Sequence, residues 1–120
     1  MFVKKITDCD LLQANDGCMI RELLHPKNDS VDLPYSIAVA TVAQNQQSHA
    51  HKLVQDEVYY ILSGQGRMVI DDETSLVSKG EVILIPADSV QRIENSGDCD
   101  LVFLAIVSPP WTKQGDIRIN

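Results

Sequence analysis

Two histidines and a carboxylate lie close together in the middle of the chain. His49 and His51 are separated by one residue, and Glu57 opens the apolar run 57–62. On an extended chain, side chains two residues apart project from the same face, so both imidazoles could reach one ion. A turn over 54–56 could bring the Glu57 carboxylate beside them. Two histidines and one carboxylate form a facial triad whose open coordination positions can take a substrate or dioxygen, so the spacing indicates a reactive metal centre.

The segments that must position these residues are short and rich in β-forming residues. Turn residues punctuate them, a pattern that is typical of an all-β sandwich or barrel. The predicted strands are 35–43, 57–62, 67–70, 73–77, 81–85, 91–95 and 101–107. The pair Asp71-Asp72 predicts a tight hairpin. A strand over 19–24, ended before Pro26, should cover one edge, and Ile117 and Ile119 alternate as a short edge strand would.

Two motifs in this order resemble the cupin superfamily, whose signatures are GxxxxxHxH followed by ExxxxxxG, and then GxxxxxPxG followed by HxxxN. The first signature is represented by His49, His51, Glu57 and Gly64. The second is represented by Gly80, Pro86, Gln91 and Asn95. The resemblance covers 35–107 and implies an all-β fold, a cupin-type double-stranded β-helix or jelly-roll barrel. We expect residues 1–120 to form one cupin domain, with an edge segment before the barrel and an extension after it.

The sequence departs from the family pattern at positions that bear on the metal. Ala43 stands where the first signature has glycine, and the gap from His51 to Glu57 is one residue longer, so that Gln55 and Asp56 are rival ligands. The fixed spacing to the following glycine favours Glu57. Gln91 stands where the family has its fourth ligand, a histidine, and a neutral amide oxygen is a poorer donor than imidazole nitrogen.

Three states of this site stay open. The metal could be held by the triad alone, or by His49, His51 and Glu57 with Gln91 as a fourth ligand. Either set suits one divalent first-row transition metal ion, namely Mn, Fe, Co, Ni or Zn. Alternatively, the site has lost its metal and the barrel is metal-free.

Residues around the predicted centre indicate a small organic ligand. Period-two alternation places Tyr59 and Ile61 on the same face as Glu57, which gives a mainly apolar lining with a few polar groups. Tyr59 is a candidate proton donor, and Arg67 could pair with a substrate carboxylate or phosphate through its guanidinium group. Trp111, after two prolines, is expected to cap the barrel end or to form a subunit contact.

Composition excludes several classes of partner. The 120-residue chain carries 10 Lys and Arg against 17 Asp and Glu, a net charge of −7, whereas nucleic acids and anionic membranes are bound by basic faces. The N-terminal residues lack the apolar region of a secretory signal, so we expect a cytoplasmic protein. The three cysteines show no zinc or disulfide spacing. The resemblance also implies a homodimer.

Two functions of different classes remain. The first is a metal-dependent enzyme that acts on a small organic molecule by oxygenase, isomerase or lyase chemistry. The second is a non-catalytic barrel that binds a small molecule or sugar and keeps a degenerate metal site. The fold does not choose between them, because function resides in the site.

Overall fold

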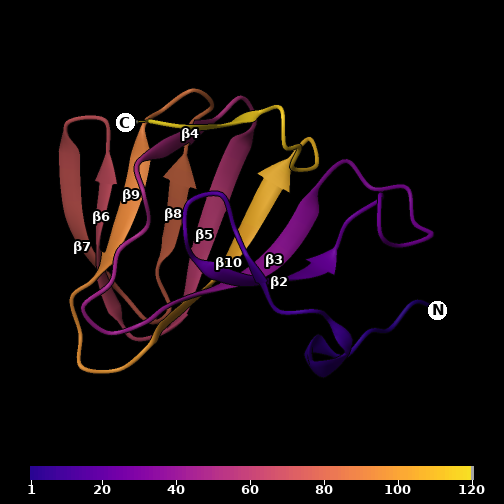
Figure 1. The fold of residues 1–120 in the computed structure, drawn as a ribbon, viewed down its shortest axis with the longest axis horizontal. Coiled ribbons are helices and arrows are strands. Elements are labelled where there is room, and N and C mark those ends of the chain that lie inside the picture. Colours follow the sequence, from indigo (N-terminus) through magenta and orange to yellow (C-terminus); the bar gives the residue numbers. More distant parts are fainter. Residues whose placement is uncertain (120) are drawn as a thin grey trace.

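The computed structural model describes residues 1–119, and its regular structure is almost entirely β-strand. Two antiparallel sheets face each other (Figure 1). The six-stranded sheet has the order β1 (Leu12–Gln13), β2 (Met19–Leu24), β3 (Ser36–Val42), β10 (Leu101–Ser108), β5 (Asp56–Ser63) and β8 (Val82–Ile85). The five-stranded sheet has the order β11 (Asp116–Arg118), β4 (His51–Leu53), β9 (Gln91–Asn95), β6 (Gln65–Ile70) and β7 (Glu73–Ser78). The jelly-roll barrel that the sequence predicts is confirmed.

The predicted strands match the observed ones closely. Each predicted run differs from its strand by at most two residues at either end. The hairpin between β6 and β7 turns through Asp71, whose φ of 52° lies in the left-handed region that two-residue hairpins use. A short 3-10 helix, η1 (Ile6–Asp8), precedes the sheets. Strands β1 and β4 were not predicted.

The core fills the space between the two sheets. Inward-facing residues alternate along β5, where Tyr59 and Ile61 are 2% and 0% exposed. They pack with Phe103 of β10, Ile93 of β9 and Met68 of β6 in one cluster. Burial of each such side chain contributes about 1.5–3 kcal/mol. The barrel is therefore a rigid support for side chains that point inward at its open end.

The outer face of the six-stranded sheet is apolar where a solvated face would be polar. Tyr60 of β5 lies directly opposite Val82 of β8. Leu62 lies two residues after Tyr60 on β5, and Leu84 lies two residues after Val82 on β8, so both share this face. Tyr60 is 40% exposed and Leu62 38%, whereas Val82 is 68% exposed and Leu84 65%. We call these four residues the outer apolar patch. It lies on β8, an edge strand, and on its neighbour.

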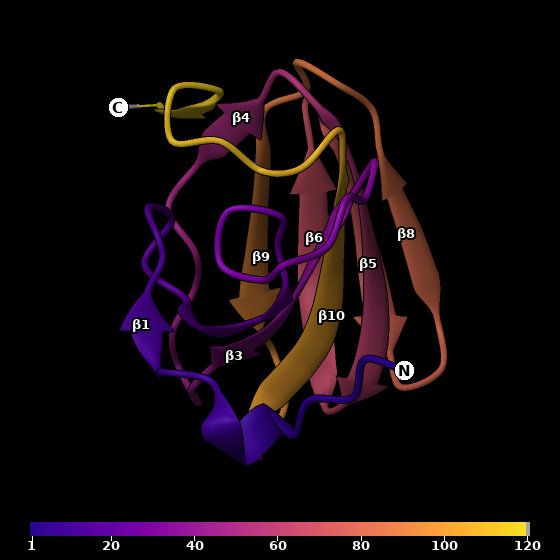
Figure 2. The same cartoon turned by 90° about the vertical axis from the view of Figure 1, so that its right-hand side faces the viewer.

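Two segments from opposite ends of the chain meet at the barrel mouth (Figure 2). The side-chain amide of Asn15, in the β1–β2 hairpin, donates a 3.0 Å hydrogen bond to the carboxylate of Asp116 in β11. The backbone N–H of Ile119 donates to the carbonyl oxygen of Ala50. These contacts fasten the hairpin and the C-terminal segment to each other and to the barrel. No helix among residues 1–119 has the length and apolar character needed to span a membrane.

Candidate functional site

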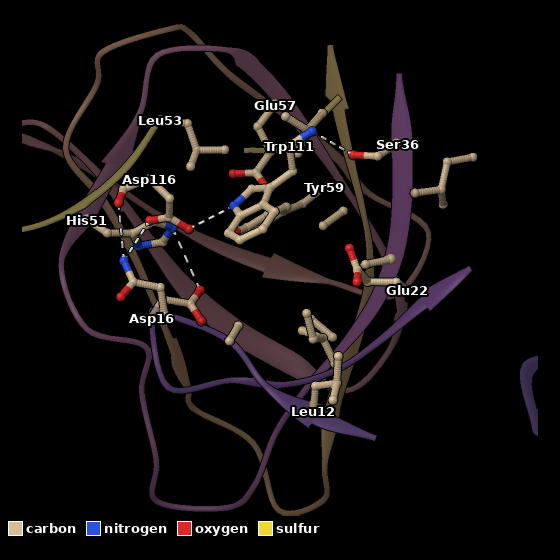
Figure 3. A pocket seen from close by; sticks show the side chains of 18 of the residues that line it. Leu12, Asp16, Glu22, Ser36, His51, Leu53, Glu57, Tyr59, Trp111 and Asp116 are labelled. Carbon is tan, nitrogen blue, oxygen red and sulfur yellow. Dashed lines mark hydrogen bonds and ion pairs between the residues drawn. The ribbon is translucent and has the colours of Figure 1, made fainter. Parts of the chain in front are cut away.

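A pocket opens at this mouth between the β1–β2 hairpin and the C-terminal segment (Figure 3). Its volume is about 230 Å³. Its apolar walls come mainly from β2, β3 and β10 and include Ile20, Ala38, Ala40, Phe103, Ala105 and Val107. Its ionisable side chains are Asp16, Glu22, Lys27, His51, Glu57, Tyr59 and Asp116. This combination suits a small organic molecule oriented by a few polar groups.

His51 points from β4 into the pocket and is 3% exposed. Its Nδ1 lies 3.1 Å from the carbonyl oxygen of His49. A carbonyl oxygen only accepts hydrogen bonds, so Nδ1 carries the ring proton and donates it. In the neutral ring, Nε2 therefore presents a lone pair. Nε2 faces Asp16 Oδ2 at 3.7 Å.

Asp16 reaches this position from the tip of the β1–β2 hairpin. Its Oδ1 accepts a 3.0 Å hydrogen bond from the backbone N–H of Cys18, and its carbonyl oxygen accepts one of 2.6 Å from the N–H of His49. The next residue, Gly17, has φ +90°, and a Cβ there would lie 3.1 Å from the His49 ring. The backbone angle at the tip favours glycine, and a Cβ there would be in tight contact with the His49 ring.

Glu57, Gln91 and Tyr59 form a buried chain of hydrogen bonds. The Gln91 side-chain N–H donates to Glu57 Oε1 at 2.9 Å, and the Tyr59 hydroxyl donates to Gln91 Oε1 at 2.9 Å. Burial is the main cause that raises the pKa of Glu57 to about 8. The Gln91 hydrogen bond lowers that pKa, and the charges of Asp16 and Asp116 raise it. Burial also raises the pKa of Tyr59 well above its usual value, so Tyr59 is a neutral donor.

His49 does not point into the pocket, in contrast to the same-face geometry expected for the histidine pair. It is exposed, and its ring lies against Gly17. The reason is a β-bulge. Gln47 pairs with Glu94 and His51 with Gln91, so four residue steps on one strand oppose three on the other. The extra residue breaks the alternation, and Ser48 is buried in place of His49.

The predicted metal ligands do not converge in this arrangement. Within residues 1–119, no three His, Cys, Asp or Glu side chains are grouped closely enough to hold a metal ion. Both polar atoms of the Gln91 amide are already hydrogen-bonded: its nitrogen donates to Glu57 and its oxygen accepts from Tyr59. A metal bound by His49, His51, Glu57 and Gln91 would require these contacts to break. The side chains as placed therefore do not fit the predicted centre.

Arg67 lies away from the pocket. Its side chain is 52% exposed on β6, and its Nε is 3.8 Å from a carboxylate oxygen of Glu94 on the neighbouring strand β9. The structure thus brings His51, Glu57, Tyr59 and Gln91 together and leaves His49 and Arg67 outside.

Several pocket residues were not identified from the sequence as site residues. Trp111 lines the pocket, and its indole N–H donates to Asp116 Oδ2 at 2.9 Å. The Lys27 ammonium lies 4.9 Å from the centre of the Trp111 ring and 3.7 Å from a Glu22 oxygen. In Figure 3, Asp16, His51 and Asp116 gather on one side of the pocket and Glu22 lies on the other. The residues Asn15 to Gly17 are typical of a turn, but the sequence does not show that this turn packs over the barrel mouth.

Comparison with known proteins places the chain in a family. Residues 38–107 match the cupin domain family, and the chain belongs to it. An uncharacterised protein of Methanocaldococcus jannaschii is 40% identical over 102 residues, which cover 84% of this chain and 81% of that protein.

Two solved structures share the fold. One is the polyketide cyclase of Streptomyces resistomycificus, with a TM-score of 0.82, 20% identity and coverage of 100% of this chain and 86% of that chain. The other is a deletion mutant of Bacillus subtilis oxalate decarboxylase, with a TM-score of 0.83, 21% identity and coverage of 97% and 32%. Both are named as enzymes, and at these identities they establish the fold of this chain alone.

Proposed function

We propose that the protein is an enzyme that binds a small organic molecule in the mouth pocket and transfers protons with His51. One observation carries this proposal: apolar walls lead to a buried imidazole whose Nε2 faces the pocket, 3.7 Å from a carboxylate oxygen of Asp16, while its Nδ1 is held by the carbonyl oxygen of His49. Nε2 is therefore placed to act as a general base. This chemistry belongs to the isomerase or lyase types that the sequence suggests.

The roles of the residues follow from their contacts. His51 Nε2 removes a proton from a carbon next to a carbonyl group of the ligand, and the imidazolium that forms lies beside the Asp16 carboxylate. His49 positions the ring, because its carbonyl oxygen holds Nδ1–H. Glu57, protonated near neutral pH by its burial, can donate to an oxygen that gains negative charge. Tyr59 and Gln91 hold Glu57 in place.

Solvent exchange tests this proposal without knowledge of the natural substrate. Small ketones and oxo acids that bind in the pocket by NMR would be incubated with the protein in D2O. Deuterium should replace hydrogen next to their carbonyl groups, and His51→Gln should slow that exchange about 100-fold or more. Arg67→Met, outside the pocket, serves as the matched control and should leave the rate unchanged. Exchange that His51→Gln does not slow would contradict the proposal.

The non-catalytic binding module is the second candidate, and the buried Glu57–Gln91–Tyr59 chain favours it. A hydrogen-bonded glutamine at this position ties up the carboxylate and the hydroxyl. Binding of compounds in the pocket with no exchange in any of them would support this module over the enzyme.

The metal-dependent enzyme differs from both candidates in its requirement for His49. Binding of Mn, Fe, Co, Ni or Zn by the predicted set needs this ring to turn inward from its position against Gly17. Metal analysis of protein purified without chelator, compared with His49→Ala, tests it. Stoichiometric metal that is lost in His49→Ala would establish the predicted centre and replace the metal-free mechanism.

We also propose that two copies associate through the outer apolar patch. Its exposed Tyr60, Leu62, Val82 and Leu84 can meet the same residues of a second copy across a two-fold axis. This arrangement would remove the patch from water and would give a homodimer, the state that the resemblance implies. A cytoplasmic location stays a prediction of the sequence.

A further inference from the structure

His51 and Glu57 present hydrogen-bond acceptors to the pocket that have no matching donors. In the neutral His51 ring Nε2 carries a lone pair, and its contact with Asp16 Oδ2 at 3.7 Å is too long for a hydrogen bond. Within residues 1–119, Glu57 has one carboxylate oxygen on Gln91, and its other oxygen makes no hydrogen bond. His51 and Glu57 are 3% and 6% exposed, and both line the pocket. A ligand that fits here must supply donors.

The pocket around these two residues also lacks positive charge. The carboxyl groups of Asp16, Glu57 and Asp116 line it. The Lys27 ammonium instead contacts the Glu22 carboxylate and the Trp111 ring. Burial of a carboxylate without a counter-charge is costly, in keeping with the raised pKa of Glu57. A bound cation would supply that counter-charge and favour the ionised form of Glu57, which only accepts hydrogen bonds. The Trp111 ring already accepts the Lys27 ammonium, so the aromatic wall is itself suited to a cation.

We propose that the ligand carries an ammonium group, placed between His51, Asp16 and Glu57, with its apolar part along the wall formed by β3 and β10. This inference rests on the proposed binding of a small organic molecule in the pocket, and not on proton removal by His51, whose Nε2 the ammonium would engage. A primary ammonium has three donors, one for each of the three acceptors, and a hydroxyl group has one. Its hydrogen bonds are also longer than metal–ligand bonds. It can therefore bridge acceptors that stand further apart than the ligands of a metal ion.

The test uses three probes with one ring and different head groups: cyclohexylamine, cyclohexanol and cyclohexanecarboxylate. Each would be titrated into the full chain, with binding followed by backbone amide NMR shifts around the pocket. Cyclohexylamine should bind about tenfold more tightly than cyclohexanol, because a charged donor replaces a neutral one. Glu57→Gln and Asp16→Asn should each remove most of this preference. Both substitutions nearly preserve the size and shape of the side chain. If one variant does not fold, the other alone is enough to test the inference.

Asp72→Asn is the matched control, because it removes one negative charge from an exposed turn distant in sequence from the pocket segments. If this control weakens amine binding as much as Glu57→Gln does, the attraction reflects the net charge of −7 and the inference is overturned. Cyclohexanol binding as tightly as the amine would also overturn it while leaving the pocket as a binding site. Absence of pocket shifts with all three probes would overturn both the inference and the proposed function.

Discussion

The side-chain amide of Gln91 donates a 2.9 Å hydrogen bond to the Glu57 carboxylate and accepts one of 2.9 Å from the Tyr59 hydroxyl. Gln91 stands where a metal-binding cupin would have a histidine. The amide therefore joins two groups that would otherwise be buried without partners. This relationship explains why a glutamine at this position can be a structural element of the pocket rather than a weakened ligand.

Replacement of Gln91 by leucine should destabilise the fold by about 2 kcal/mol, because the buried Glu57 and Tyr59 groups each lose a partner. Urea unfolding followed by fluorescence or circular dichroism measures the change. Gln44→Leu, at an exposed position in a turn, should change the free energy of unfolding by less than about 0.5 kcal/mol. Equal effects of the two substitutions would show that the hydrogen-bond chain does not stabilise the fold.

Glu57 should make stability depend on pH. Its pKa is raised from 4.5 to about 8 in the folded protein, so folding favours the protonated form. This contribution is fully present below the unfolded pKa near 4.5 and is lost as the pH rises through about 8. The free energy of unfolding should therefore fall by a few kcal/mol between these limits.

Glu57→Gln should remove that fall, and the surface substitution Glu94→Gln should retain it. Urea unfolding at intervals from pH 5 to pH 9 measures all three proteins. A difference between the original protein and Glu57→Gln that stays constant over this range would mean that Glu57 titrates normally.

Two glycine substitutions separate backbone strain from crowding. Gly17 and Gly80 have φ of +90° and +87°, but an added Cβ lies 3.1 Å from the His49 ring at Gly17 and meets nothing within 4 Å at Gly80. Gly80→Ala should cost about 1 kcal/mol from strain alone. Gly17→Ala should cost more and should also weaken binding of cyclohexylamine, because it displaces Asp16. If neither variant changes the binding of cyclohexylamine, the hairpin tip does not contribute to ligand recognition.

The outer apolar patch should control association. Analytical ultracentrifugation of the 13.3 kDa chain should show a dimer, and Leu84→Lys should convert it to a monomer. Leu76→Lys is a matched control, since Leu76 is 69% exposed on β7 of the other sheet. A monomeric original protein, or a dimer that Leu84→Lys leaves intact, would disprove the proposed interface.

The barrel could be predicted from the sequence because its strands alternate regularly and its turns carry strong signals. The hairpin at Asp71 and the inward face of Glu57, Tyr59 and Ile61 follow from this local pattern. The position of His49 could not be predicted, because a single extra residue in the ladder reverses the face on which a side chain lies. The spacing of the two histidines alone does not show this bulge.

The contribution of Asp16 and Asp116 could not be predicted for a different reason. Each lies on a segment near one end of the chain, and the two are brought together by long-range contacts such as that of Asn15 with Asp116. Such contacts leave no short-range signal in the sequence. Arg67 shows the converse case, since its residue type suits an anionic substrate but its strand directs it to the surface.

The rim of the pocket is built from outside the segment that matches the family. Asp16 and Asp116 both lie beyond residues 38–107. Substitutions in either terminal segment can therefore change which molecules are admitted while the barrel keeps its interior unchanged. Exchange of the two terminal segments between relatives should therefore transfer ligand preference from one barrel to another.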